Sequence, residues 1–242
     1  MGNSSSTKAH METAQKTGTL GLANCGLNKL PDGLDKLKAN LRTLDVSGNK
    51  LNKPDSFPPC LSQFQMMKTL VMVGCELVEL PEGIFSMKKL ETLNVSNNKI
   101  KSLTSKVGQL KSLKSLNITN NSIQSLPDSL PQCKNLEVIE ASYNILQSLP
   151  TGLGQLNIQE LNANRNRLSD IPAELKNCPR LKILRLEENC LSLNDNLRTI
   201  LGDSGVSLIC LEGNLITQKE LDNTEEYKKY MERFTATKKK IF

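Results

Sequence analysis

The sequence repeats itself about every 23 residues, and no other feature restricts its possible folds as strongly. Five segments, which start at residues 90, 113, 136, 158 and 181, share apolar residues at their first, fourth, sixth and eleventh positions and Asn at the ninth. Weaker copies start at Thr17, Leu41, Met67 and Val206, which gives nine units over residues 17–216. Units this short cannot bury an apolar face alone, so we expect them to stack into a solenoid.

The pattern L-x-x-L-x-L-x-x-N-x-L, as in LETLNVSNNKI at 90–100, resembles that of the leucine-rich-repeat family. The resemblance implies an α/β horseshoe of about nine repeats with a parallel concave sheet. The residues agree, because alternating strand side chains place the apolar pair of L-x-L on one inner face. The motif Asn follows each strand, where its amide can satisfy backbone groups of neighbouring turns.

The second half of most units reads L-P-x-x-L-x-x-L, as at Leu126-Pro127. Proline ends extended structure, and apolar residues three apart predict a short helical turn on the convex side. Two units depart from this pattern. Residues 51–65 are longer and proline-rich, and the eighth unit has apolar residues at helical spacing over 193–201.

The chain divides into three predicted parts. Residues 1–16 form an N-terminal arm with a lipidation signal and a short capping helix over 7–16, and residues 17–216 form the solenoid. Residues 217–242 form a C-terminal capping helix and a basic tail, with Tyr227, Tyr230 and Phe234 close to one helical face. A repeat array needs such caps because its end units would otherwise expose apolar surface. A partner-binding role for the last helix is the alternative.

Composition argues against an enzyme. The single histidine, His10, lies outside the repeats, and no zinc spacing, P-loop or dinucleotide-binding motif is present. We therefore expect no catalytic residue, metal, cofactor or small-molecule substrate. The net charge of +6 is modest and dispersed, so we expect no nucleic-acid partner. Seven cysteines without a secretory signal indicate free thiols in the cytoplasm.

The N-terminal sequence MGNSSS fits the signal for N-myristoylation at Gly2. A single myristoyl chain anchors a protein weakly and reversibly, so membrane lipid is a predicted partner on the cytoplasmic face. The segments HMETAQKTG at 10–18 and KYMERFTATKKK at 229–240 also resemble the ends of a small vertebrate group of leucine-rich-repeat proteins. That resemblance implies an intracellular, myristoylated protein.

Large charged and aromatic side chains gather in the last four units, on the expected concave face. We predict that this stretch binds a protein partner, because Tyr and Arg are enriched at binding hot spots. The candidate residues are Glu140, Tyr143, Glu160, Arg165, Arg185, Glu187, Glu188 and Glu212. The competing interpretation is that Arg165 pairs only with Glu188, and Arg185 only with Glu160, along the sheet.

These observations favour a non-enzymatic intracellular interaction scaffold that is tethered to membranes by myristate. The alternative is a soluble cytosolic adaptor or regulator, for example of a phosphatase or a ubiquitin ligase, without lipid. An enzyme would need a clustered acid–base constellation, and the sequence offers no candidate for one.

Overall fold

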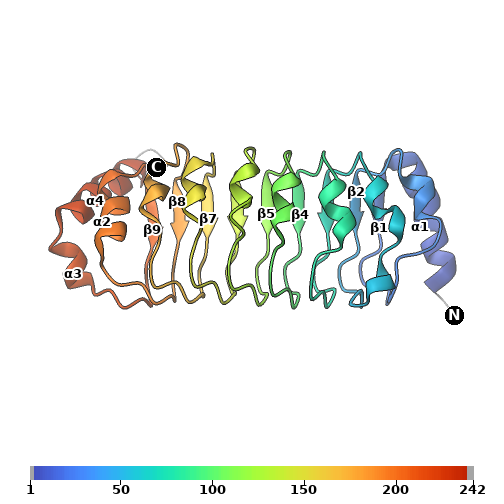
Figure 1. The fold of residues 1–242 in the computed structure, drawn as a ribbon, viewed down its shortest axis with the longest axis horizontal. Coiled ribbons are helices and arrows are strands. Elements are labelled where there is room, and N and C mark those ends of the chain that lie inside the picture. Colours follow the sequence, from blue (N-terminus) through green and yellow to red (C-terminus); the bar gives the residue numbers. More distant parts are fainter. Residues whose placement is uncertain (1–2, 239–242) are drawn as a thin grey trace.

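The computed structural model describes residues 3–238 and confirms the predicted solenoid with its parallel sheet of nine strands (Figure 1). The strands follow one another in chain order, and the middle residue of each aligns with the middle residue of the next. They are β1 (Thr19–Gly21), β2 (Thr43–Asp45), β3 (Thr69–Val71), β4 (Thr92–Asn94), β5 (Ser115–Asn117), β6 (Val138–Glu140), β7 (Glu160–Asn162), β8 (Ile183–Arg185) and β9 (Leu208–Cys210).

Short helical turns run along the opposite side of the repeats, as the L-P-x-x-L-x-x-L pattern predicts. They are 3₁₀ helices η1 (Leu34–Leu37), η2 (Pro54–Ser56), η3 (Pro59–Gln63), η4 (Glu82–Ser86), η5 (Ser105–Gln109), η6 (Leu130–Gln132), η7 (Thr151–Gln155) and η8 (Ala173–Asn177). Proline precedes or opens six of these turns, η2 to η4 and η6 to η8, where its fixed φ suits a helical start and its missing N–H costs nothing.

The two irregular units account for the other features of this side. The proline-rich segment at 51–65 forms two separate turns, η2 and η3, instead of one. The eighth unit forms a true α-helix, α2 (Asp195–Asp203), whose first turn is capped by the side chain of Asn194. Its apolar residues Leu197, Ile200 and Leu201 are buried, as their spacing predicts.

The core is a continuous aliphatic column between the sheet and the helical turns. The middle residues of β1 to β8 are all 0 or 1% exposed. Phe64 and Phe85 bring aromatic rings into the second and third repeats. The column explains how a chain without tryptophan and with five phenylalanines folds stably. Each repeat buries its leucines against the two repeats beside it.

The motif asparagines form a ladder behind the strands, which confirms their structural role. The side-chain amide of Asn144 donates to the carbonyls of Ile118 (3.0 Å) and Ala141 (3.2 Å), and its Oδ1 accepts from the N–H of Ile123 (3.0 Å). In the third repeat Cys75 replaces the asparagine, and its thiol donates to the carbonyl of Val46 at 3.2 Å. The ladder thus pairs backbone groups that the strands leave unpaired.

Helices cover both ends of the sheet (Figure 1). Helix α1 (Asn3–Thr17) packs on β1, with Ala14 fully buried. It begins four residues earlier than the predicted segment of 7–16. Gly2, the predicted lipidation site, and Lys239 and Lys240 of the basic tail lie outside the described residues.

The C-terminal end is covered by α3 (Gln218–Asp222) and α4 (Glu225–Lys238). The hydroxyl of Tyr230 accepts from the N–H of Ile209 at 3.1 Å and donates to its carbonyl at 3.4 Å, on the side of β9 that faces away from β8. Arg233 donates to the carbonyls of Leu201 and Gly202 at the end of α2. These contacts protect an edge strand whose backbone groups would otherwise remain available for pairing.

Candidate functional site

A row of left-handed backbone conformations runs along one rim of the sheet, three residues after each strand. All nine residues in this row have φ between 52° and 75°. They are Asn24, Gly48, Gly74, Asn97, Asn120, Tyr143, Arg165, Glu188 and Gly213. Each directly precedes the motif Asn or Cys, so the turn that leaves the strand requires this conformation in every repeat.

Three neighbouring repeats fill the row with residues that rarely adopt it. Glycine and asparagine tolerate a positive φ, and they occupy the other six positions. Tyr143, Arg165 and Glu188 adopt the left-handed conformation at φ 55°, 54° and 52°. This conformation costs about 1 kcal/mol at each of the three residues. We call these three residues the rim ladder. Strain of this kind persists where the surrounding structure enforces it, and it concentrates at functional sites.

The side chains of the rim ladder contact one another in sequence. The guanidinium carbon of Arg165 lies 4.7 Å from the centre of the Tyr143 ring. Arg165 also donates from Nε (2.9 Å) and one terminal nitrogen (2.7 Å) to the same oxygen of Glu188. All three remain accessible, because Tyr143 is 48% exposed and the side chains of Arg165 and Glu188 are 46% and 55% exposed.

The sheet face beside the rim ladder carries a second set of polar contacts. Arg185 forms an ion pair with Glu160, and both side chains are half-buried. Asn162 donates to Glu140 at 2.9 Å, and Asn164 donates to Glu187. The two charge pairs that the competing interpretation requires, Arg165–Glu188 and Arg185–Glu160, are therefore both formed. Part of the charge on this face is neutralised within the chain.

A negative surplus remains after this pairing. The eight candidate residues comprise five glutamates, two arginines and one tyrosine, with a formal charge of −3. Within the described residues 3–238, Glu140, Glu187 and Glu212 form no ion pair, and amide groups are the bonding partners of the first two. Burial, together with the nearby carboxylates of Glu187 and Glu212, raises the pKa of the Cys210 thiol between them. The face therefore keeps a net negative charge after its internal ion pairs are formed.

Tyr143, Arg165 and Glu188 do not lie on the strands themselves. Strands β6, β7 and β8 end at Glu140, Asn162 and Arg185, so the predicted partner site divides into a sheet face and a rim. The sequence prediction missed the left-handed row. Its signal was present in the eighth position of the repeat, where Gly and Asn recur and the three bulky residues interrupt them.

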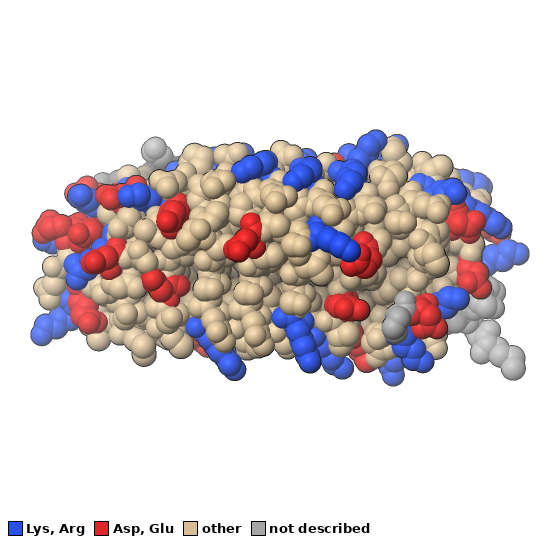
Figure 2. Space-filling model, viewed as in Figure 1, with Lys and Arg blue, Asp and Glu red and all other residues tan. Residues whose placement is uncertain are grey.

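The described residues contain no cluster of potential metal ligands and no membrane-spanning helix. No group of three or more His, Cys, Asp and Glu side chains in this part of the chain could hold a metal ion. None of the helices in residues 3–238 is long and apolar enough to cross a membrane. Figure 2 shows that Lys and Arg are dispersed along the long edges of one face, while uncharged residues fill most of its middle.

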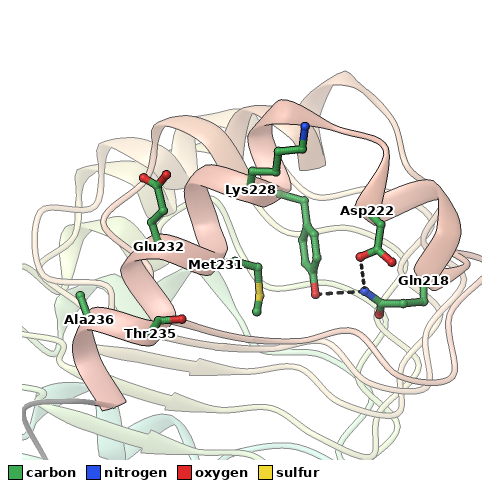
Figure 3. Close-up of a pocket in the computed structure, with 8 residues that line it drawn as sticks. Gln218, Asp222, Lys228, Met231, Glu232, Thr235 and Ala236 are labelled. Atoms are coloured by element: carbon green, nitrogen blue, oxygen red, sulfur yellow. Dashed lines mark hydrogen bonds between the residues drawn. The ribbon is translucent and has the colours of Figure 1, made fainter.

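A hollow of about 700 Å³ lies between α3 and α4 at the C-terminal cap (Figure 3). Gln218 donates there to Asp222 (2.8 Å) and to the hydroxyl of Tyr227 (3.2 Å), so its amide ties the two helices together. Lys228, Met231 and Glu232 line the rest. The hydrogen bonds in the hollow therefore stabilise the packing of α3 against α4.

Comparisons with known proteins agree with the fold. A family model described as a leucine-rich repeat region matches residues 54–208, and one described as a leucine rich repeat matches residues 40–64. A curated relative, the volume-regulated anion channel subunit LRRC8D of Rattus norvegicus, is 33% identical over 87 residues. That match covers 35% of this chain and 10% of the relative, so the chain spans a small part of the relative's length.

Solved structures resemble the solenoid over most of its length. An internalin, InlF of Listeria monocytogenes, has a TM-score of 0.71 and 22% identity over 88% of this chain and 58% of its own. The complex PEPR1–AtPEP1 has a TM-score of 0.62 and 24% identity over 78% of this chain and 30% of that one. The plant peptide hormone receptor RGFR1 with RGF2 has a TM-score of 0.56 and 21% identity over 82% and 40%. These similarities establish the fold.

Proposed function

Because the chain belongs to the leucine-rich-repeat family, we propose that it is a non-enzymatic scaffold that binds a protein partner along β6 to β9. The binding surface comprises the rim ladder and, on the sheet face, Glu140, Glu160 and Arg185. Glu187 and Glu212, two residues past the ends of β8 and β9, complete it. A myristoyl group on Gly2 tethers the scaffold to the cytoplasmic face of membranes. The resemblance of residues 10–18 and 229–240 to a small vertebrate intracellular group supports this part of the proposal.

The rim ladder is the observation that carries the partner-binding proposal. Gly or Asn would fill its positions without strain, as in the six other repeats, yet Tyr143, Arg165 and Glu188 occupy three consecutive ones. Internal contacts compensate only in part, because exposed ion pairs contribute about 0–1 kcal/mol and exposed cation–π contacts about 0.5–1 kcal/mol. Contacts between a partner and the exposed ring of Tyr143 and guanidinium of Arg165 would account for the strain that remains at these positions.

The structural relatives support a protein or peptide as the partner. Two of them were solved as complexes, PEPR1 with AtPEP1 and the plant peptide hormone receptor RGFR1 with RGF2. A continuous curved surface of this class recognises extended partners through side chains that project from successive repeats. The acidic surplus of β6 to β9 suits a partner with basic side chains at the contact.

A triple variant tests the partner site. Tyr143→Ala, Arg165→Ala and Arg185→Ala together should keep the folded state within about 1 kcal/mol, because none of these side chains belongs to the aliphatic core. The variant should lose its main captured protein, since each hot-spot truncation costs about 2 kcal/mol or more of binding. Quantitative mass spectrometry of captured proteins, together with urea unfolding, measures both effects.

The matched control changes three exposed residues on the opposite side, Lys106, Lys134 and Glu174, to Ala. The control should capture the same proteins as the unchanged chain. Retention of all partners by the first variant, with loss in the control, would place the binding site on the helical side.

The lipid tether separates the scaffold from the soluble adaptor that is its alternative. Gly2→Ala removes the acceptor for an amide-linked myristoyl group and should move the protein from the membrane fraction to the soluble fraction. Fractionation of cells, with mass spectrometry of the mature N-terminus, measures this. Equal distribution of the two proteins, without an acyl group on Gly2, would favour the soluble adaptor.

A further inference from the structure

We infer that the groove between α1 and the first repeat is a binding site for a fatty acyl chain, and that the myristoyl group on Gly2 is its occupant. The identity of this occupant rests on the proposed lipid tether. The inference adds a second position for the lipid, folded against the protein instead of inserted in the membrane.

The groove has the shape that an elongated ligand requires. One wall is a single face of α1, because Thr7, Met11 and Gln15 follow one another at intervals of four residues, with Lys8 and Glu12 beside them. This wall extends over about two helical turns, or about 12 Å. The groove is partly open to solvent, and its volume of about 630 Å³ lies within the range of small-molecule sites.

The opposite wall comes from the first repeat, where Leu27, Pro31 and Gly33 are half-buried. A methyl group placed on Gly33 would meet no atom within 4 Å, so the glycine leaves this wall open. Met11 and Leu27 pack against the aliphatic core from the two sides of the groove. The base of the groove is therefore apolar and continuous with the core.

Long polar side chains form the margins. Lys8, Gln15 and Lys36 are exposed, and such residues lay their methylene groups along apolar surface while their polar ends reach water. Four of the lining residues are charged, Lys8, Glu12, Asp32 and Lys36, and all four are exposed to solvent. This combination, an apolar base with amphipathic edges, suits a saturated chain better than a polar ligand.

The position of the groove selects the occupant. Gly2 directly precedes Asn3, the first residue of α1, and Thr7 at the nearer end of the groove lies about 6 Å further along the helix. Because Gly2 immediately precedes the helix that forms one wall of the groove, an acyl chain attached to it has only a short distance to span. Binding of the myristoyl group in the groove competes with its insertion into the membrane. Membrane attachment of the protein then depends on a factor that displaces the myristoyl group from the groove.

Calorimetric titration of the unacylated full chain with sodium myristate, below its micelle concentration, tests the groove directly. The unchanged chain should bind myristate at one site. Met11→Asp and Leu27→Asp, on opposite walls, should each weaken binding by about tenfold or more, because an apolar chain cannot pack against a desolvated carboxylate. Leu215→Asp is the matched control, since Leu215 is 71% exposed at the other end of the solenoid and should bind as the unchanged chain does.

Circular dichroism and thermal unfolding determine whether each variant is folded. If one of the two variants does not fold, the variant on the opposite wall still provides the test. A second titration uses full chain carrying the myristoyl group on Gly2, which should not bind added myristate because its own chain fills the groove. Unweakened binding by both groove variants, or full binding by the acylated chain, would overturn the inference. Either result leaves the tether intact, because fractionation of Gly2→Ala reports on that separately.

Discussion

At the scale of single residues, the most informative feature is a backbone angle. The turn after each strand requires a positive φ, and six repeats meet this requirement with Gly or Asn. Asn97 and Asn120 show the relaxed version, in which the amide of Asn120 donates to the side-chain oxygen of Asn97 at 2.8 Å. Tyr143, Arg165 and Glu188 occupy the same position in the next three repeats. Their backbone is strained there, and they expose an aromatic ring and a guanidinium.

Conversion of the rim ladder to the relaxed version should therefore separate stability from binding. The triple variant Tyr143→Asn, Arg165→Asn and Glu188→Asn relieves strain of about 1 kcal/mol at each position and removes exposed contacts of smaller value. We expect the free energy of unfolding to rise by about 1 kcal/mol or more, while partner capture falls. Urea unfolding and capture measure the two effects. A clear loss of stability would mean that the ladder is primarily a structural device.

At the scale of elements, the motif asparagine links one repeat to the next. Asn144 is 7% exposed and bonds to backbone groups of its own repeat and of the preceding one. The strands are only three residues long, so the ladder of side-chain amides supplies cohesion that longer strands would obtain from their own hydrogen bonds. The sulfur of Cys75 takes one of these bonds but not the full set.

Asn144→Ala should consequently lower the free energy of unfolding by about 2–4 kcal/mol, because it leaves buried carbonyl and N–H groups unpaired. Asn144→Cys should lower it by less, since a thiol can still donate to the carbonyl of Ile118 as Cys75 does to that of Val46. Urea unfolding of both variants provides the comparison. An equal loss in the two would show that packing, and not the hydrogen bonds, determines the effect.

The sequence was sufficient to predict most elements, for reasons that differ between them. The 23-residue period determined nine strands and their order, because each L-x-L pair must face the same core. Helix α2 could be predicted from the spacing of Leu197 and Ile200. The additional turn of α1 before residue 7 could not be predicted, because Ser4, Ser5 and Ser6 have low helix propensity and no apolar period. The left-handed row was also missed, because a positive φ is indicated in the sequence only by the recurrence of Gly and Asn at the eighth position of the repeat.

At the scale of the whole molecule, the solenoid separates stability from recognition. The aliphatic column, the asparagine ladder and the two caps hold the repeats together, while the concave side and its rim are left to side chains that the fold does not need. The N-terminal cap carries the proposed lipid site, and the acidic stretch of β6 to β9 lies toward the opposite end. A tethered molecule can thus present its partner surface away from its point of attachment.

Site-specific photo-crosslinking tests the central claim, that β6 to β9 and the rim ladder bind the partner, most directly. A benzophenone side chain in place of Tyr143 retains an aromatic ring at a position that is 48% exposed, and one in place of Glu174 probes the helical side. Irradiation in cells should yield a discrete protein adduct from position 143 and none from position 174. Adducts from position 174, with none from position 143, would contradict the proposed site.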